Sequence, residues 1–251
     1  MKLTGKFIIY GQIETLTGLH IGGSKTSMDI GEVDLNVIKS PKGVPFIPGS
    51  SLKGKMRSLL AKTEGKMDVN DDNRYIKEIF GSAADQDKDI ITRLIVRDAA
   101  LNSKAFEADF QDVEMDFEYS SIKFENRIDR RTGTAKDPRQ LERVPAGAKF
   151  DFEIVYDVYD DVNAKIDENS SENRLKKHLW ALHRAMQLLQ DDYLGGQGSR
   201  GYGKVRFLEM KAQFKSIAQN YTVQKLEGEM LDFATKIQEL HKDALQFQFA
   251  E

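Results

Sequence analysis

The 251-residue chain contains no cysteine, which excludes disulfide bonds and thiolate metal sites. A chain without thiols suits a reducing compartment, so we expect a cytoplasmic location. No apolar run approaches the roughly 18 residues that a membrane span needs, and the first residues lack the apolar region and cleavage site of a signal peptide. With 40% hydrophobic and 31% charged residues, the composition is that of a soluble globular protein with a packed core and no membrane partner.

The motifs of common nucleotide and metal enzymes are also missing. Residues 196–201 match G-x-G-x-x-G, but a helix is expected before them and a strand after them, the reverse of a dinucleotide-binding turn. We interpret these glycines as permitting positive φ angles and close backbone approach. His178 and His183 are five residues apart on a predicted helix and share no face, so we expect them at the surface or at its boundary.

Hydrophobic periodicity predicts the order strand, helix, strands, excursion, strand, helix, strand. The helix in 171–190 is the clearest, because Leu175, Leu179, Leu182, Met186 and Leu189 fall on one face. This order indicates an α+β fold, with helices on one face of an antiparallel sheet in an RRM-like (ferredoxin-like) core with insertions. The other predicted strands lie in 2–23, 91–101, 112–125, 148–159 and 203–214, and the other helices in 50–62, 73–82 and 229–244.

We interpret residues 1–251 as one domain with three additions. Residues 61–91 form a helical and loop insertion, and residues 216–251 a helical extension. Between them lies a thumb insertion at 120–145; residues 126–147 have no sustained period and are rich in arginine, glycine and proline, which predicts an exposed hairpin or protruding loop. The alternation just before it predicts a strand with Val113, Met115 and Phe117 on one face.

Charge is distributed unevenly along a chain whose net charge is only −3. From Lys123 to Lys149 there are eight Lys and Arg against four acids, and acidic residues dominate on both sides of this segment. One basic stripe on a mildly acidic protein is compatible with a polyanion bound along one face. Ordinary variation of surface charge is the alternative.

The stretch FIPGSSLKGKMRSLL places three cations at the start of a predicted helix. Cations oppose the helix dipole there, whereas the unpaired amides and the Ser50 and Ser51 hydroxyls favour an anion. Lys53 and Arg57, four apart, share a face, and Lys55 points elsewhere. Bound phosphates would resolve this conflict; a slightly unfavourable exposed helix start is the alternative.

Asp34 is the acidic residue to single out, in DIGEVDLNVIK, with His20 on the preceding segment. One carboxylate can hold a divalent ion or orient a 2′-hydroxyl for attack on the adjacent phosphate. A solvated turn residue is the plainer alternative.

Six segments in order resemble the RAMP superfamily of CRISPR proteins. They are LHIGG, GEVDLNVIK, PFIPGSSLKGKMRSLL, LIVRDAAL, NRIDRRTGTAKDPRQLERVPAGAKF and GGQGSRGYGKVRF. The chain looks most like the repeating, Cas-seven-like backbone subunit of type III-A (Csm) effector complexes. The match covers most of residues 1–215, and the last 35 or so carry no motif that we recognise.

The resemblance implies an RRM-like core with a protruding thumb, assembled head-to-tail along a guide RNA. Its partners would be guide RNA, target RNA, further copies of the chain and other Csm-complex subunits. Residues Ile128 to Arg139 match the thumb that wedges into the guide–target duplex. The RNA-binding residues that it implies are His20, Ser51, Lys53, Lys55, Arg57, Arg127, Arg130, Arg131, Arg139 and Arg200. We expect Lys53, Arg57 and the arginine-rich excursion to lie on one continuous basic track.

By the same resemblance, Asp34 is the residue required for target RNA cleavage, together with a divalent metal ion, expected to be Mg²⁺. The chain would then be a metal-dependent endoribonuclease that acts on target RNA within the assembled complex. Three alternatives are a non-catalytic RAMP subunit that caps the filament, a RAMP endoribonuclease that processes precursor guide RNA, and a plain single-stranded-RNA-binding module. The second commonly uses histidine chemistry and the third uses stacking aromatic residues, for which this sequence shows no clear motif.

Overall fold

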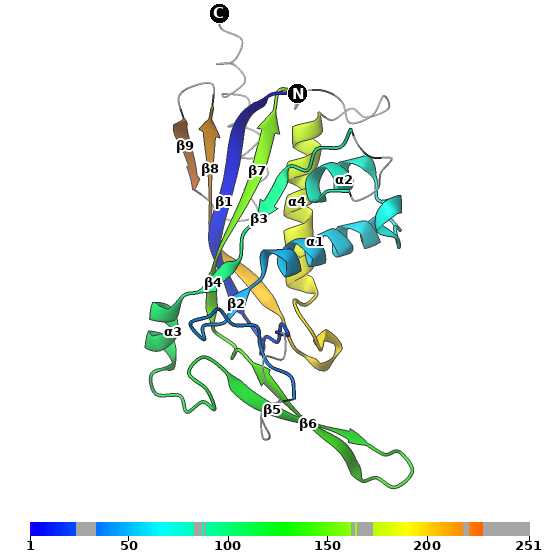
Figure 1. Ribbon diagram of the computed structural model, residues 1–251, viewed down its shortest axis with the longest axis vertical. Coiled ribbons are helices and arrows are strands. Elements are labelled where there is room, and N and C mark those ends of the chain that lie inside the picture. Colours follow the sequence, from blue (N-terminus) through cyan, green and yellow to red (C-terminus); the bar gives the residue numbers. More distant parts are fainter. Residues whose placement is uncertain are drawn as a thin grey trace, which may run out of the picture.

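The computed structural model describes residues 1–23, 34–82, 87, 89–161, 164, 173–217 and 221–227 (Figure 1). In chain order its elements are β1 (Leu3–Thr15), β2 (Phe46–Ile47), α1 (Gly49–Thr63), the 3₁₀ turn η1 (Val69–Asp71), α2 (Arg74–Phe80), β3 (Leu94–Val96), β4 (Ala99–Leu101), α3 (Ser103–Phe110), β5 (Ser121–Ile128), β6 (Ala135–Arg143), β7 (Lys149–Tyr159), α4 (Arg174–Asp191), the 3₁₀ turn η3 (Gly198–Arg200), β8 (Val205–Ser216) and β9 (Thr222–Glu227). The predicted helix in 229–244 lies outside the described residues.

One antiparallel sheet organises the molecule, in the strand order β2-β4-β7-β1-β8-β9, with β3 also paired to β7. The central strand β1 pairs along its length with β7 and β8. Helices α1, α2 and α4 pack together on one side of this sheet (Figure 1). The predicted α+β class, with helices against an antiparallel sheet, is confirmed. The segment predicted as a strand in 91–101 forms two short strands, β3 and β4.

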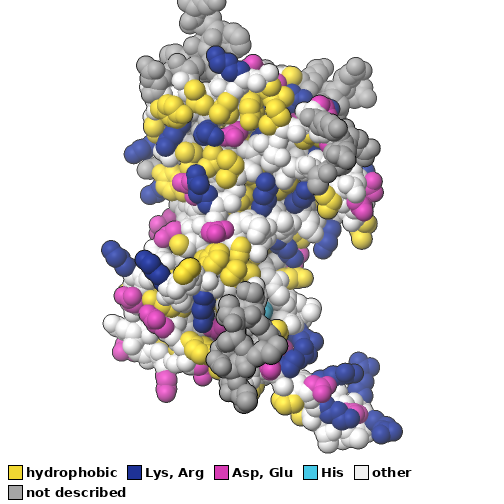
Figure 2. All heavy atoms as spheres, in the orientation of Figure 1, with side chains coloured by type: hydrophobic (Ala, Val, Ile, Leu, Met, Phe, Trp, Pro, Cys, Tyr) yellow, Lys and Arg dark blue, Asp and Glu magenta, His cyan; other side chains and the backbone are white. Residues whose placement is uncertain are grey.

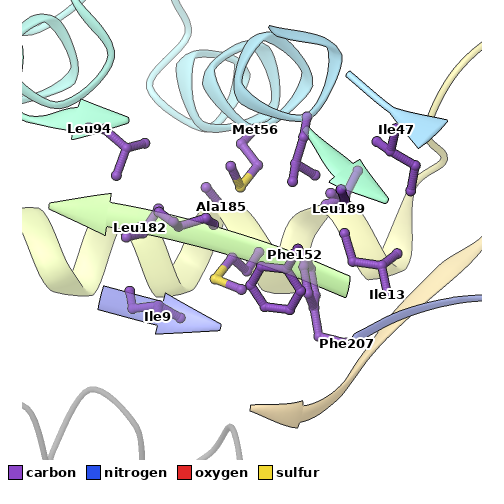
Figure 3. Close-up of a cluster of buried hydrophobic side chains, with 14 of the residues drawn as sticks. Ile9, Ile13, Ile47, Met56, Leu94, Phe152, Leu182, Ala185, Leu189 and Phe207 are labelled. Carbon is purple, nitrogen blue, oxygen red and sulfur yellow. The ribbon is translucent and has the colours of Figure 1, made fainter. Parts of the chain in front are cut away.

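The core lies between the sheet and the helices. All five apolar residues that define the predicted face of α4 are buried. Figure 3 shows Leu182 and Leu189 of α4 near Met56 of α1 and near aromatic and aliphatic side chains of the strands. Full burial of one such side chain contributes about 1.5–3 kcal/mol. The same periodicity that predicts α4 therefore accounts for its place in the fold.

Helix α1 begins one residue before the predicted range 50–62. The helix begins at Gly49, its N-cap is Pro48, and no side chain caps it, so Ser50 and Ser51 lie inside the helix. A distant carboxylate takes over this role, because the Gly49 amide donates to Asp98 Oδ1 at 2.8 Å. Tight packing also fixes the start, since a Cβ on Gly49 would lie 2.2 Å from the Val96 carbonyl oxygen.

The strand predicted for residues 112–125 is wrong over its first half. Just before this segment the chain forms α3, which was not predicted and which begins at Asn102, whose side chain accepts a hydrogen bond from the Ala105 amide at 3.1 Å. A loop follows, and β5 begins only at Ser121. Val113 and Phe117 are 51% and 40% exposed, so their alternation does not reflect a buried strand face.

His178 is also misplaced by the sequence prediction, because it is fully buried. Its Nδ1 lies 2.8 Å from the Tyr156 hydroxyl, and its Nε2 lies 3.2 Å from Glu78 Oε2. Its helical face carries the buried leucines, and these polar partners on β7 and α2 make burial of the imidazole possible. His183 is half-buried.

The arginine-rich excursion is an antiparallel hairpin. Strands β5 and β6 form a two-stranded sheet of their own, paired from Ser121↔Arg143 to Ile128↔Ala135. The hairpin extends away from the main sheet at the lower right of Figure 1. No described helix is long and apolar enough to cross a membrane.

Candidate nucleic-acid interface

A glycine-rich loop between α4 and β8 lies at the centre of the candidate site. Gly195 has a φ of +78°, and a Cβ there would lie 2.3 Å from the His20 carbonyl oxygen. The Gly196 amide donates to that same oxygen at 2.8 Å. The glycines therefore provide positive φ and close backbone approach, as predicted, and they bring the loop against the segment that carries His20.

His20 is buried between this loop and β6. Its Nδ1 lies 2.7 Å from the Glu142 carbonyl oxygen. On its other side, a Cβ at Gly196 would lie 3.5 Å from the His20 ring carbon Cδ2. His20 thus joins the glycine-rich loop to the base of the hairpin.

Asp34 is exposed and is held by the same strand. Its Oδ2 accepts a hydrogen bond from the Gln140 amide at 2.9 Å. The next residue, Leu35, forms a parallel bridge with Leu141, and its carbonyl accepts the Glu142 amide at 3.0 Å. The structure therefore attaches Asp34 and His20 to positions two residues apart on β6.

Glu142 organises this junction, and the sequence did not single it out. Its buried carboxylate accepts hydrogen bonds from the Val37 amide at 2.9 Å and from the Ser120 hydroxyl, and it pairs with Lys39. In the sequence it is one of four acids that dilute the basic segment. The available signal was its place between the apolar residues Leu141 and Val144, both buried in the structure.

Of the three cations in the first half of α1, only Lys55 is directed to this site. Its Nζ lies 3.4 Å from Asp192 Oδ2 and 3.6 Å from the centroid of the Tyr193 ring. This ring packs on the glycine-rich loop, because a Cβ on Gly198 would lie 2.0 Å from it. Lys55 and the loop therefore form one surface.

Lys53 and Arg57 share a face, as predicted, but it is directed elsewhere. Lys53 Nζ donates to the Leu94 carbonyl at 2.8 Å, and Arg57 Nε lies 2.7 Å from the buried carboxylate of Asp72. Burial, followed by the charge of Arg57, lowers the pKa of Lys53. The expectation of one track through Lys53, Arg57 and the hairpin is therefore wrong, because these contacts lead to β3 and η1. Ser51 is half-buried on the same helix.

Arg200 connects the glycine-rich loop to the hairpin. Its guanidinium donates to Gln197 Oε1 at 2.9 Å and lies 3.5 Å from Glu125 Oε2 on β5. Lys123 Nζ is 3.3 Å from the same carboxylate and 4.4 Å from the centroid of the Tyr202 ring. Burial opposes ionisation of Glu125, but Tyr202 and these cations hold its pKa below the usual range.

The far end of the hairpin is basic and exposed. Figure 2 shows Lys and Arg side chains gathered over it. Lys136 pairs with Asp129 at 2.7 Å within the hairpin. The predicted RNA-binding residues exposed on it are Arg127, Arg130, Arg131 and Arg139.

A metal ion has one clear candidate ligand in the site. Among the described residues, no group of three or more His, Asp or Glu side chains is placed to hold a metal. Mg²⁺ is nevertheless commonly bound by one or two carboxylates together with substrate phosphates and water. The exposed carboxylate of Asp34 fits that mode and does not fit a cage made of protein ligands alone.

Fold and site together define an α+β protein with a basic surface that runs from Lys55 over the glycine-rich loop to the β5–β6 hairpin, beside an anchored carboxylate. Such a surface is suited to a polyanion. The chain belongs to the RAMP superfamily, whose family model matches residues 12–206.

The similar proteins agree on one group within that superfamily. Over 219 residues the chain is 44% identical to "CRISPR system Cms endoribonuclease Csm3" of Streptococcus thermophilus, covering 86% of this chain and 92% of the relative. The protein of the same name from Methanocaldococcus jannaschii is 40% identical over 222 residues, covering 84% and 82%. A crystal structure of the Csm3-Csm4 subcomplex of the type III-A CRISPR-Cas interference complex matches with a TM-score of 0.62 and 28% identity, covering 95% of this chain and 98% of that one.

Proposed function

We propose that this chain is the repeating backbone subunit of a type III-A CRISPR complex that binds guide RNA and cleaves complementary target RNA at regular intervals. One observation carries the proposal: β6, at the base of a basic hairpin, fixes both Asp34 and His20 beside the loop that presents Arg200. The relatives' shared name, an endoribonuclease of a CRISPR system, supports it.

In this proposal the main sheet and its helices act as an RRM-like core, and the β5–β6 hairpin acts as the thumb. Copies assemble head-to-tail along the guide RNA in the cytoplasm, with other Csm-complex subunits. A heterologous contact that does not close on itself produces such a filament. The hairpin suits the role of thumb because it is a separate sheet with four exposed arginines.

The basic surface holds the guide RNA by its backbone, while base pairing reads the target sequence. Lys55 and Arg200 meet phosphates beside the glycine-rich loop, and the hairpin arginines meet phosphates of the duplex. Each phosphate neutralised releases counterions, so the affinity for RNA falls steeply as salt rises, despite the net charge of −3.

Cleavage follows from positioning. The hairpin splays one target nucleotide so that its 2′-hydroxyl oxygen is in line with the next phosphorus and its 5′-oxygen. The 2′-oxygen bonds to phosphorus as the bond to the 5′-oxygen breaks; Asp34 helps to remove the 2′-hydroxyl proton, and the departing 5′-oxygen takes a proton from water. A divalent ion, when bound, supplies positive charge that stabilises the transition state. Asp34 is the residue to hold it, and buried His20 positions the loop beside it.

The test uses the assembled complex with Asp34→Ala. We expect target cleavage to be lost, while complex assembly and target RNA binding stay at wild-type levels, because Asp34 is an exposed side chain with one described hydrogen bond. Asp71→Ala, at an exposed carboxylate of η1, is the matched control and keeps full cleavage. Undiminished cutting by the Asp34→Ala complex would refute the proposal.

A further inference from the structure

A second surface, which is aromatic and acidic and not basic, lies between α3 and the loop that precedes β5. A groove of about 470 Å³ opens there. Its floor is aromatic: Phe106 and Tyr119 are buried, and Phe110 stacks on Phe106 with ring centroids 4.4 Å apart. Val113 and Phe117 line the groove and are exposed.

The charged side chains that line this groove are acidic, namely Glu107, Asp116 and Glu118, while Lys39 Nζ lies 4.9 Å from the centroid of the Phe117 ring. From residue 107 to residue 118 every ionisable side chain is Asp or Glu, and all of these are exposed: Glu107, Asp109, Asp112, Glu114, Asp116 and Glu118. Lys149 pairs with Asp109 at 2.9 Å. In the lower-left part of Figure 2, where α3 lies in Figure 1, Asp and Glu side chains gather around apolar ones. Apolar anchors would bind in this groove, and positive charges would bind around it.

We propose that this groove docks a basic polypeptide segment of a different protein, with apolar side chains in the groove and Lys or Arg against the rim. RNA is a poor occupant because its phosphates would face the carboxylates of Glu107, Asp116 and Glu118. The basic hairpin of a second copy of this chain has the complementary charge. This step rests on the proposed function, in which that hairpin is engaged with RNA and cannot fill the groove. The partner is therefore another chain of the assembly.

The physical fit is that of a small recognition site. A groove of about 470 Å³ lies within the usual range of ligand sites, roughly 300–1,000 Å³, and holds a few apolar side chains. Buried aromatic and aliphatic anchors supply most of the affinity of such contacts. The acidic rim adds specificity and a faster association rate, which depend on ionic strength.

Site-specific photo-cross-linking tests the proposal in the assembled complex. A photoreactive amino acid replaces Val113, and the control carries it at Val69 on η1, where the exposure is 53% against 51%. We expect the cross-linked peptide at position 113 to come from a different protein and to combine apolar residues with Lys or Arg. Cross-links to a second copy of this chain, to RNA, or at no greater yield than from position 69 would overturn the proposal.

A charge variant gives an independent measurement. Val113→Lys, made without the photoreactive amino acid, places a cation in the groove and should lower the copurification of the partner identified by cross-linking at least tenfold, whereas Val69→Lys should leave it unchanged. Equal recovery of that partner with both variants would contradict the proposal. The guide RNA that copurifies with each variant reports separately on the proposed function, because neither substitution lies on the basic surface.

Discussion

At the scale of single residues, the three cations in the first half of α1 have three different environments. Arg57 pairs with the buried carboxylate of Asp72, and Lys53 donates to a carbonyl. Moving either onto a phosphate would leave a buried acceptor unpaired, which is costly. Lys55 pairs instead with the partly exposed Asp192 and lies over the Tyr193 ring. We therefore expect Lys55 to contribute more to RNA binding than Lys53 or Arg57.

Lys55→Gln should weaken RNA binding for all sequences alike and lower the slope of log affinity against log salt by about 0.7 to 0.9, the contribution of one phosphate contact. Lys62→Gln, at an exposed position in the last turn of the same helix, should leave the slope unchanged. A salt titration of RNA affinity for both variants decides the matter. An unchanged slope with Lys55→Gln would remove this residue from the interface.

The sequence predicted which residues share a helical face, but not which residues contact that face. The spacing of Lys53, Lys55 and Arg57 separated the first and third from the second, and the structure agrees. Their partners could not be predicted, because Asp72 and Leu94 are 15 and 41 residues away and reach α1 only through the fold. Glu142 escaped notice for the same reason, since its hydrogen-bond partners come from residues 37 and 120.

At the scale of elements, the glycine-rich loop depends on close contact as well as on φ. Gly195 and Gly201 have φ values of +78° and +84°, but only at Gly195 would a Cβ meet another atom within 4 Å. The pair therefore separates the two effects. The strain of a positive φ is common to both, and the approach to His20 belongs to Gly195 alone.

We expect Gly201→Ala to lower the free energy of unfolding by about 1 kcal/mol, the cost of a left-handed conformation. Gly195→Ala should lower it by about 3 kcal/mol, because the His20 segment must also shift. Urea denaturation of both variants measures the difference. Equal losses would show that the loop does not press on His20 as described.

Elements with a strong period were predictable, and those held by distant partners were not. The apolar face of α4 and the antiparallel strands β1, β7 and β8 follow from periodicity. Helix α3 was missed because it has only one buried residue, Phe106, and begins at an Asn102 cap. The loop after it alternates by chance, with apolar side chains that line an open groove and do not form a strand face.

At the scale of the whole molecule, a buried polar network joins α2, α4 and the sheet. Glu78 binds the Arg174 guanidinium at 2.9 Å and lies 3.2 Å from His178. His178 in turn contacts Tyr156 of β7. Burial alone would raise the pKa of Glu78, but His178 and Arg74, then Arg174, lower it to about 2. Burial lowers the pKa of His178 and outweighs the attraction of Glu78.

Both shifts make the fold less stable in acid. Below the ordinary histidine pKa of 6.5, the unfolded chain binds a proton that buried His178 resists, so stability falls with pH from about 7 to 5. The contribution of Glu78 is complete above its ordinary pKa of 4.5 and is lost as the pH falls toward about 2.

Thermal unfolding across pH 5 to 7 should therefore show a falling midpoint. His178→Gln should be less stable than wild type at pH 7, with a shallower slope over this range. A midpoint that rises on acidification would contradict this assignment.

The sequence predicted the fold class and the uneven charge, since both depend on composition and period. It did not predict how the basic residues divide among surfaces, which depends on where each helix faces. The expected track through Lys53, Arg57 and the hairpin was therefore wrong about Lys53 and Arg57, whose contacts are with Leu94 and Asp72.

The most direct test of the account is RNA–protein cross-linking of the assembled complex, read by mass spectrometry. The account predicts cross-links at Lys55, in the loop 192–204 and along the hairpin 121–143. The alternative is that RNA binds instead at a polar surface on the main sheet that includes Arg97 and Lys211. Cross-links confined to that surface, with none from Lys55, the loop or the hairpin, would contradict the claim that this basic surface holds the RNA.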